Sequence, residues 1–241
     1  MHIISIGNSF SQNTTTKLIL LGHLFNNPLH VVNLYIPGCS LKMHYENIFT
    51  DERLYEYQID GINRRMTSLS EVNLDEFDII TIQQFSGDSG NLCSVEPYLG
   101  EIIKYINKKA ATSKIIYHKT WAYFEGIEHP HFYKYNHSNA IMNKKIDDVT
   151  DWICKKYNLS YIPMAEVVSQ VSKNFNLKLS NDGYHLDTEE GKLVGALAWY
   201  FYLIDINQAY TSLNSGISNE EILFYFIRKV VNESINEISK I

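Results

Sequence analysis

The sequence has few cysteines and no basic block, and each lack excludes a class of protein. The three cysteines, Cys39, Cys93 and Cys154, are an odd number at wide spacings. They indicate neither a complete disulfide framework nor a zinc knuckle, and they favour a reducing compartment. With 21 Lys and Arg against 27 Asp and Glu, the net charge is −6, and no stretch gathers the basic residues. Nucleic acid is therefore not expected as a partner.

Long apolar runs are also lacking. The start, MHIISIGNSFS, has neither the basic residues nor the apolar run of a secretory signal, although a chain with its signal removed would look the same. No segment reaches the roughly 18 uninterrupted apolar residues of a membrane helix; residues 193–206 come nearest. We therefore expect a soluble, cytoplasmic protein with no membrane partner.

What is present is typical of a folded chain. The sequence is 45% hydrophobic and 20% charged, which is enough for a full core and excludes disordered or low-complexity material. Its length suits one large domain, and no internal repeat divides it. We expect a single domain over residues 1–241. Its last part, residues 210–241, is expected as a helical extension that packs on the domain or contacts a second copy.

Short apolar runs alternate with segments of helical periodicity. The expected strands are His2–Ile6 closed by Gly7, His30–Ile36, Phe77–Ile82, Lys114–His118 and Ser160–Pro163. Helices are expected after a turn at 9–13 and at 95–108, 138–157, 165–175, 189–206 and 220–238, while region 41–73 is assigned only as mixed helix and loop. This alternation predicts an α/β fold, a mostly parallel sheet of about five strands between two layers of helices. Ligands then bind in the loops after the strands.

Two short segments near opposite ends of the chain carry candidate chemistry. GNSFS places Ser9 at a strand-to-helix turn, where backbone N–H groups can stabilise an oxyanion. NDGYHLD contains His185 as a candidate base, and Asp182 can reach its Nδ1 because Gly183 allows a tight turn. The pattern predicts a nucleophile, a base and an orienting acid.

These segments resemble the first and last motifs of the SGNH hydrolases, also called the GDSL esterase/lipase superfamily. The resemblance implies a flavodoxin-like three-layer α/β/α sandwich and a Ser9-His185-Asp182 triad that needs no cofactor or metal. PGCS matches the second motif, so Gly38 would add its N–H to that of Ser9 in the oxyanion hole. Asn8 stands where Asp is commoner and would organise the loop rather than catalyse.

The third motif departs from the family pattern. Many members carry Gly-x-Asn-Asp, whose Asn is the third oxyanion donor, whereas this chain has QQFSGD over residues 83–88. A glutamine amide can donate the same hydrogen bond. We expect Gln84 to do so, with Gln83 as the alternative.

For several other side chains the sequence gives weaker evidence of a function. Trp121 and Tyr123 follow the fourth expected strand, where they could contact substrate or simply pack at the edge. The segment with His129, His131 and His137 is interpreted as a loop bordering the substrate cleft, because no cysteine and few acids accompany it, and no metal site is expected. Cys39 has no base paired with it in the sequence and is interpreted as incidental.

The function expected from this resemblance is that of a serine esterase that removes a small acyl group, acetyl above all, from a carbohydrate. Alternatives on the same fold are a catalytically weak or inactive carbohydrate-binding protein, which the missing Asn favours, and an O-acyltransferase. A nucleotide-binding module is disfavoured because GNSFSQN has neither a dinucleotide fingerprint nor a phosphate loop.

Overall fold

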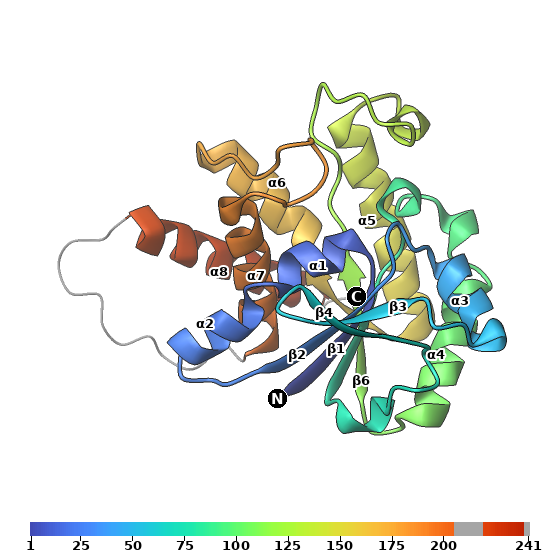
Figure 1. Ribbon diagram of the computed structural model, residues 1–241. Coiled ribbons are helices and arrows are strands. Elements are labelled where there is room, and N and C mark those ends of the chain that lie inside the picture. Colours follow the sequence, from blue (N-terminus) through green and yellow to red (C-terminus); the bar gives the residue numbers. More distant parts are fainter. Residues whose placement is uncertain (205–218, 239–241) are drawn as a thin grey trace.

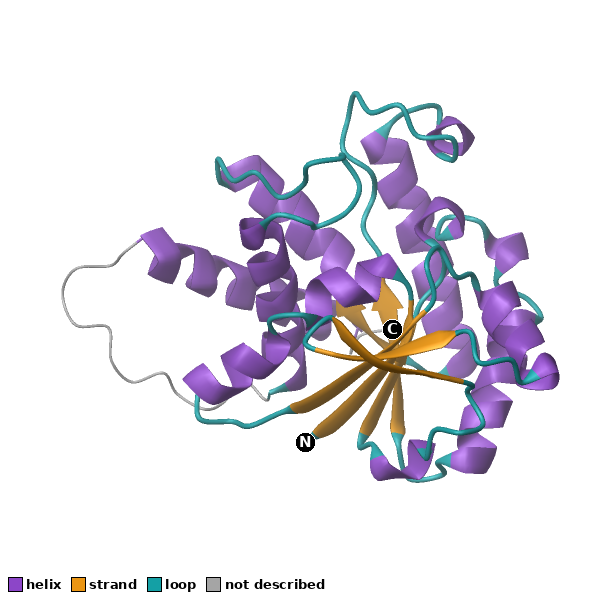
Figure 2. Ribbon diagram, in the orientation of Figure 1, coloured by secondary structure: helices purple, strands orange, loops and turns teal. Residues whose placement is uncertain are grey.

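A seven-stranded sheet forms the centre of the molecule, with strand order β4-β3-β2-β1-β5-β6-β7 (Figures 1 and 2). The computed structural model describes residues 1–204 and 219–238. The strands are β1 (His2–Gly7), β2 (His30–Tyr35), β3 (Tyr55–Ile59), β4 (Ile62–Thr67), β5 (Ile79–Ile82), β6 (Lys114–Lys119) and β7 (Ser160–Pro163). The expected helix end at Ile206 and the connector at 205–218 lie outside the described residues.

Strand β1 is the middle strand of the sheet and pairs in parallel with β2 and β5. Its side chains alternate between two cores, with Ile3 in one and Ile4 and Ile6 in the other. Burial on both faces explains why β1 carries isoleucine on both of its faces. The parallel strands β2-β1-β5-β6-β7 have the order of a flavodoxin-like sheet. The expected α/β fold is confirmed.

The expected count of about five strands is too low, because an antiparallel hairpin of β3 and β4 extends the sheet beyond β2. Region 41–73, assigned as mixed helix and loop, contains this hairpin after helix α3 (Leu41–Thr50). Most of β4 is exposed and lacks apolar alternation. The missed signal was Asp60-Gly61, whose positive φ values of 53° and 70° suit the two-residue turn of a hairpin.

Helices cover both faces of the sheet (Figure 1). One face carries α1 (Ser9–Thr15), α2 (Leu18–Leu24), α6 (Met164–Asn174), α7 (Glu189–Leu203) and α8 (Asn219–Ile238). The other carries α3, α4 (Tyr98–Lys109) and α5 (Asn139–Tyr157). Short 3-10 turns are η1 (Leu74–Glu76), η2 (Ser86–Asp88), η3 (Leu92–Ser94) and η4 (Phe132–Tyr135). Among the described residues, no helix combines the length and apolarity needed to cross a bilayer.

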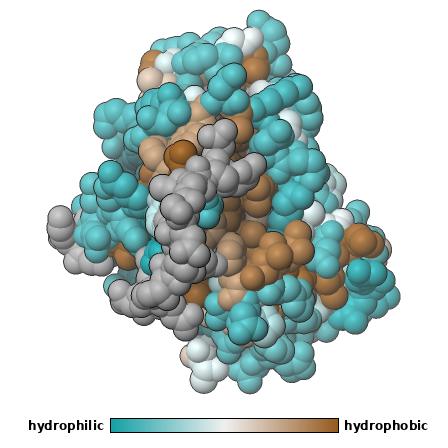
Figure 3. Space-filling model, turned by 90° about the vertical axis from the view of Figure 1, so that its left-hand side faces the viewer, coloured by the Kyte–Doolittle hydropathy of each residue, from teal (hydrophilic) through white to brown (hydrophobic). Residues whose placement is uncertain are grey.

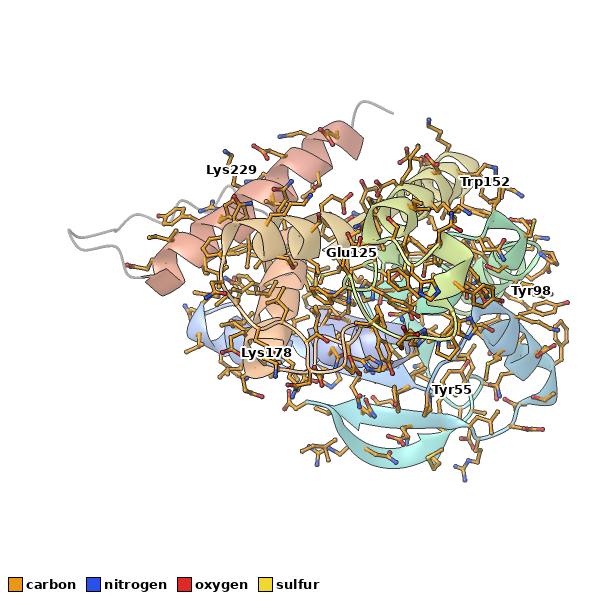
Figure 4. All side chains as sticks on the ribbon, turned by 90° about the horizontal axis from the view of Figure 1, so that it is seen from above. Tyr55, Tyr98, Glu125, Trp152, Lys178 and Lys229 are labelled. Carbon is orange, nitrogen blue, oxygen red and sulfur yellow. The ribbon has the colours of Figure 1, made fainter. Side chains whose placement is uncertain are left out.

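Helix α8 packs on α6 and α7, with Phe224 edge-on to Phe201 at 4.5 Å between ring centroids. Figure 4 shows Lys229 of α8 on one side of the molecule and Tyr55 of the hairpin on the other. Figure 3 views the side of α2 and α8, where apolar side chains reach the surface; Leu24 is 67% exposed. Contact of the C-terminal helix with a second copy stays a prediction.

Two histidines inside the fold should make its stability depend on pH. His44 and His118 are fully buried, and burial lowers the pKa of each to about 3. Below about pH 6.5 the unfolded chain binds protons that the folded chain does not, so stability is lost as the pH falls from 6.5 towards 3. Over this range each of the two histidines should lower the unfolding free energy by up to about 1.4 kcal/mol per pH unit.

This acid sensitivity can be measured by urea unfolding at pH 7, 6 and 5. We expect His118→Gln to reduce the slope of the unfolding free energy against pH, whatever its effect at pH 7. The control His23→Gln alters an exposed ring and should keep the wild-type slope. An unchanged slope in His118→Gln would contradict the assignment.

Candidate active site

A cavity of about 230 Å³ opens at the carboxyl ends of the central strands. Loops after β1, β2, β5 and β6 and the loop before α7 contribute to its wall. Its lining residues are Asn8, Ser9, Tyr35, Pro37, Gly38, Phe85, Ser86, His129, Tyr184 and His185. The structure thus brings residues from the beginning and the end of the chain to one site, where a parallel sheet of this kind binds its ligands.

Ser9 is the first residue of α1, directly after the turn that ends β1. Its Oγ lies 2.7 Å from Nε2 of His185. The imidazole is in turn held through Nδ1, which lies 2.7 Å from Oδ2 of Asp182. The three side chains form one hydrogen-bonded chain in which the hydroxyl can lose its proton to the ring.

The local turn fixes Asp182 relative to His185. Oδ1 of Asp182 accepts the backbone N–H groups of Tyr184 at 3.0 Å and of His185 at 2.9 Å. Gly183 has φ +85°, and a Cβ there would collide with the Ile127 side chain, so this position favours glycine. Burial alone would raise the pKa of Asp182, but the N–H groups of His185 and Tyr184 together with the imidazole hold it below its usual value. The carboxylate therefore stays charged beside the ring.

The loop that carries Asp182 and His185 is also held by the segment after β6. Trp121 Nε1 donates to the carbonyl of Tyr184 at 2.9 Å, and the N–H of Phe124 donates to the carbonyl of Gly183 at 2.8 Å. The Trp121 ring is 1% exposed and stacks on Phe10. The suggested substrate contact of Trp121 is therefore not supported, because its ring is buried and does not line the cavity.

Asn8 links three of the loops. Its Oδ1 accepts the N–H of Phe10 at 3.0 Å and Nε2 of Gln83 at 2.5 Å, while its Nδ2 donates to the carbonyl of Cys39 at 2.9 Å. The side chain caps α1 and ties the loops after β2 and β5 to it. Asn8 thus organises the loops around Ser9, as expected.

Gly38 lines the cavity with a φ of +60°, a left-handed conformation that favours glycine, although a Cβ there would meet nothing within 4 Å. The next residue, Cys39, is fully buried, and burial raises the pKa of its thiol to about 12. Although the sequence pairs no base with Cys39, its Sγ lies 3.4 Å from Nδ1 of His44. As a buried neutral thiol, Cys39 fixes the loop and is no nucleophile.

Gln84 cannot act as the expected oxyanion donor in this structure. Its Nε2 donates to the carbonyl and the hydroxyl of Ser94, at 2.9 and 3.0 Å. Its Oε1 accepts the N–H groups of Leu41 and Phe85. Both Gln84 and Gln83 are fully buried and neither lines the cavity. The amide supports the loop instead of facing Ser9.

Phe85 and Ser86 are the residues of this loop that line the cavity, and Ser86, which was not among the expected site residues, carries a hydroxyl. Its Oγ lies 2.9 Å from the hydroxyl of Tyr123. Tyr123 is fully buried, so the suggested substrate contact of its ring is not supported either. The segment QQFS contained a signal for Ser86, because a serine hydroxyl two residues after Gln84 can also donate a hydrogen bond.

His129 borders the cavity, as expected for its loop, and its ring lies 4.6 Å from that of Tyr184. Burial and the neighbouring His131 and His185 lower the pKa of His129. Its Nδ1 accepts the N–H of His131 at 3.2 Å, which places the proton of the neutral ring on Nε2. Residues 1–204 and 219–238 contain no group of three side chains suited to a metal.

The fold is that of several hydrolases of GDSL and acetylxylan esterase type. A catalytic mutant of an acetylxylan esterase from Geobacillus stearothermophilus matches with a TM-score of 0.55 at 15% identity, over 82% of this chain and 91% of that one. A lipase/acylhydrolase from Enterococcus faecalis matches with a TM-score of 0.53 at 15% identity, over 83% and 94%. At such identities the likeness concerns the fold alone.

A narrower assignment comes from the sequence. Residues 2–219 match the family described as "Domain of unknown function (DUF4886)", and the chain belongs to this family. A DUF4886 family protein from Bacteroides uniformis has a TM-score of 0.85 at 27% identity, over 98% of this chain and 94% of that one. Comparison with the curated proteins gives no match.

Proposed function

We propose that the protein is a serine esterase of the SGNH type that removes a small acyl group, acetyl above all, from a carbohydrate. The observation that carries this proposal is the unbroken hydrogen-bonded chain from Ser9 through His185 to Asp182, which opens on a cavity. The fold shared with acetylxylan esterases and a lipase/acylhydrolase supports it.

The contacts suggest the order of events. His185 takes the proton of Ser9 as its Oγ attacks the ester carbonyl, and it later gives that proton to the leaving alcohol. Asp182 keeps the proton of the ring on Nδ1 and stabilises the imidazolium. In this proposal the N–H groups of Ser9 and Gly38 receive the oxyanion, and water then releases the acyl group by the same steps.

The size of the cavity supports a short acyl chain. A volume of about 230 Å³ lies below the roughly 300–1,000 Å³ usual for sites that enclose a drug-sized ligand. This volume favours an acetyl group over a long acyl chain, which would extend beyond the cavity. In this proposal the neutral ring of His129, which borders the cavity, donates its Nε2 proton to a hydroxyl or ester oxygen of the substrate.

Fluorophosphonate labelling and a series of p-nitrophenyl esters from acetate to octanoate test the proposal. We expect labelling at the peptide that contains Ser9, identified by mass spectrometry. We also expect kcat/KM to be highest for acetate and at least roughly tenfold lower for octanoate, because each misplaced methylene weakens transition-state binding.

Two other results would point to the alternatives. Folded protein that is neither labelled nor active on any ester would favour the carbohydrate-binding protein and contradict the proposal. Acyl transfer to an added sugar in preference to water would favour the O-acyltransferase, which shares the triad but uses a different acceptor.

A further inference from the structure

Ser86 and Tyr123 form a pair of hydroxyl groups at the wall of the cavity. Ser86 Oγ and the Tyr123 hydroxyl lie 2.9 Å apart, and the two residues are 2% and 0% exposed. Ser86 lines the cavity together with Ser9 and Gly38, whereas Tyr123 does not. Ser86 therefore borders the site, and Tyr123 lies behind it.

The hydrogen-bond partners decide which of the two hydroxyls donates. In the described part of the chain, the Tyr123 hydroxyl has no hydrogen-bond partner other than Ser86. Burial raises the pKa of Tyr123, so the phenol keeps its proton. If Ser86 donated, that buried phenol proton would have no acceptor, which is unfavourable. Tyr123 therefore donates to Ser86, and the proton of Ser86 is free to point into the cavity.

We propose that the Ser86 hydroxyl is the third donor of the oxyanion hole, beside the N–H groups of Ser9 and Gly38, and that Tyr123 is the positioning residue that aims it. The inference rests on the proposed esterase function and deepens it. No proton is transferred, because Ser86 keeps its O–H and donates a hydrogen bond as negative charge develops on the carbonyl oxygen. The amide that the family pattern would use is committed elsewhere, since Gln84 Nε2 donates to Ser94.

Support from Tyr123 makes this donor effective in two ways. The hydrogen bond fixes the rotation of the Ser86 hydroxyl before substrate binds, so the donor needs no reorientation during the reaction. Donation by the phenol also polarises the Ser86 O–H and strengthens its own donation. The gain is realised mainly in the transition state, where the oxygen carries most charge.

Steady-state kinetics of three variants and one control, all on p-nitrophenyl acetate, test the inference. We expect Ser86→Ala to lower kcat roughly 100-fold with KM nearly unchanged, because only transition-state binding is lost. Ser86→Thr keeps the hydroxyl and should recover most of the loss. Tyr123→Phe leaves Ser86 in place without its orienting partner, and kcat should fall roughly tenfold, also with KM nearly unchanged.

Ser89→Ala is the matched control. Ser89 lies on the same loop, is 2% exposed and donates to the carbonyl of Phe85, but it does not line the cavity. We expect it to keep the wild-type kcat. The inference is overturned if Ser86→Ala keeps wild-type kcat, or if Ser86→Ala and Ser89→Ala lose activity equally.

The failure of this inference can be told apart from failure of the esterase proposal. A wild-type enzyme that is labelled and active while Ser86→Ala is fully active overturns only the role of Ser86. A wild-type protein without labelling or turnover overturns the esterase proposal, and the inference falls with it. Should Ser86→Ala not fold, Tyr123→Phe decides, and wild-type kcat in that variant contradicts the inference.

Discussion

Replacing Ser9 with alanine is expected to lower kcat/KM for p-nitrophenyl acetate by roughly 10⁴- to 10⁶-fold and to abolish fluorophosphonate labelling. The Oγ of Ser9 is the only part removed, and it is the atom that lies 2.7 Å from Nε2 of His185. Without it the base has no hydroxyl to activate. Initial rates and gel-based labelling of the purified variant measure the effect.

Ser11→Ala provides the control for this experiment. Ser11 lies two residues further along α1 and is fully buried, and its Oγ is 2.8 Å from both the carbonyl of Asn8 and Oδ1 of Asn33. Its loss should reduce the unfolding free energy by about 1 kcal/mol and leave labelling intact. Persistent labelling in Ser9→Ala, or loss of labelling in folded Ser11→Ala, would show that Ser9 is not the nucleophile.

The sequence could indicate that Ser9, His185 and Asp182 meet, because the geometry of the chain around Ser9 and around the Asp182–His185 turn is local. Gly183 permits the turn that brings Asp182 to His185, and Ser9 directly follows a buried strand. The parallel sheet then places both loops at one edge, so motif and topology together predict the meeting.

Which side chain of the third motif borders the cavity could not be predicted in this way. Gln84 and Ser86 come from one loop, and which of them faces the cavity depends on side-chain direction and on partners distant in sequence. Ser94 binds the Gln84 amide and Tyr123 binds the Ser86 hydroxyl, and neither pairing follows any spacing rule. The burial of the Trp121 ring could not be predicted for the same reason, because it depends on contact with Phe10, which is distant in sequence.

The hairpin of β3 and β4 shows a second limit. Periodicity identifies strands by their buried positions, but β4 lies at the sheet edge and is mostly exposed, so its sequence INRRMT carries no such signal. Turn chemistry at Asp60-Gly61 was the available evidence. An edge strand is therefore better found from its turn than from its own residues.

Asp182→Asn is expected to lower kcat about 10⁴-fold while the protein still folds. Oδ1 of Asp182 accepts the N–H groups of Tyr184 and His185, and Oδ2 faces Nδ1 of His185. An asparagine has one oxygen, and if it stays with the backbone N–H groups its NH₂ faces Nδ1. The ring must then accept at Nδ1 and carry its proton on Nε2, where it donates to Ser9 instead of taking the proton of Ser9.

Asp187→Asn separates this tautomer effect from a general loss of charge in the loop. Asp187 accepts the N–H and the Nδ2 of Asn181 and bonds neither His185 nor Ser9 among the described contacts. We expect its kcat to stay within about threefold of wild type, since no group at the reacting atoms changes. Steady-state kinetics at pH 7, with thermal unfolding as a check on folding, measures both variants. Equal losses in the two would mean that Asp182 acts through loop structure, whereas a large loss in Asp182→Asn alone follows only from its bond to the imidazole.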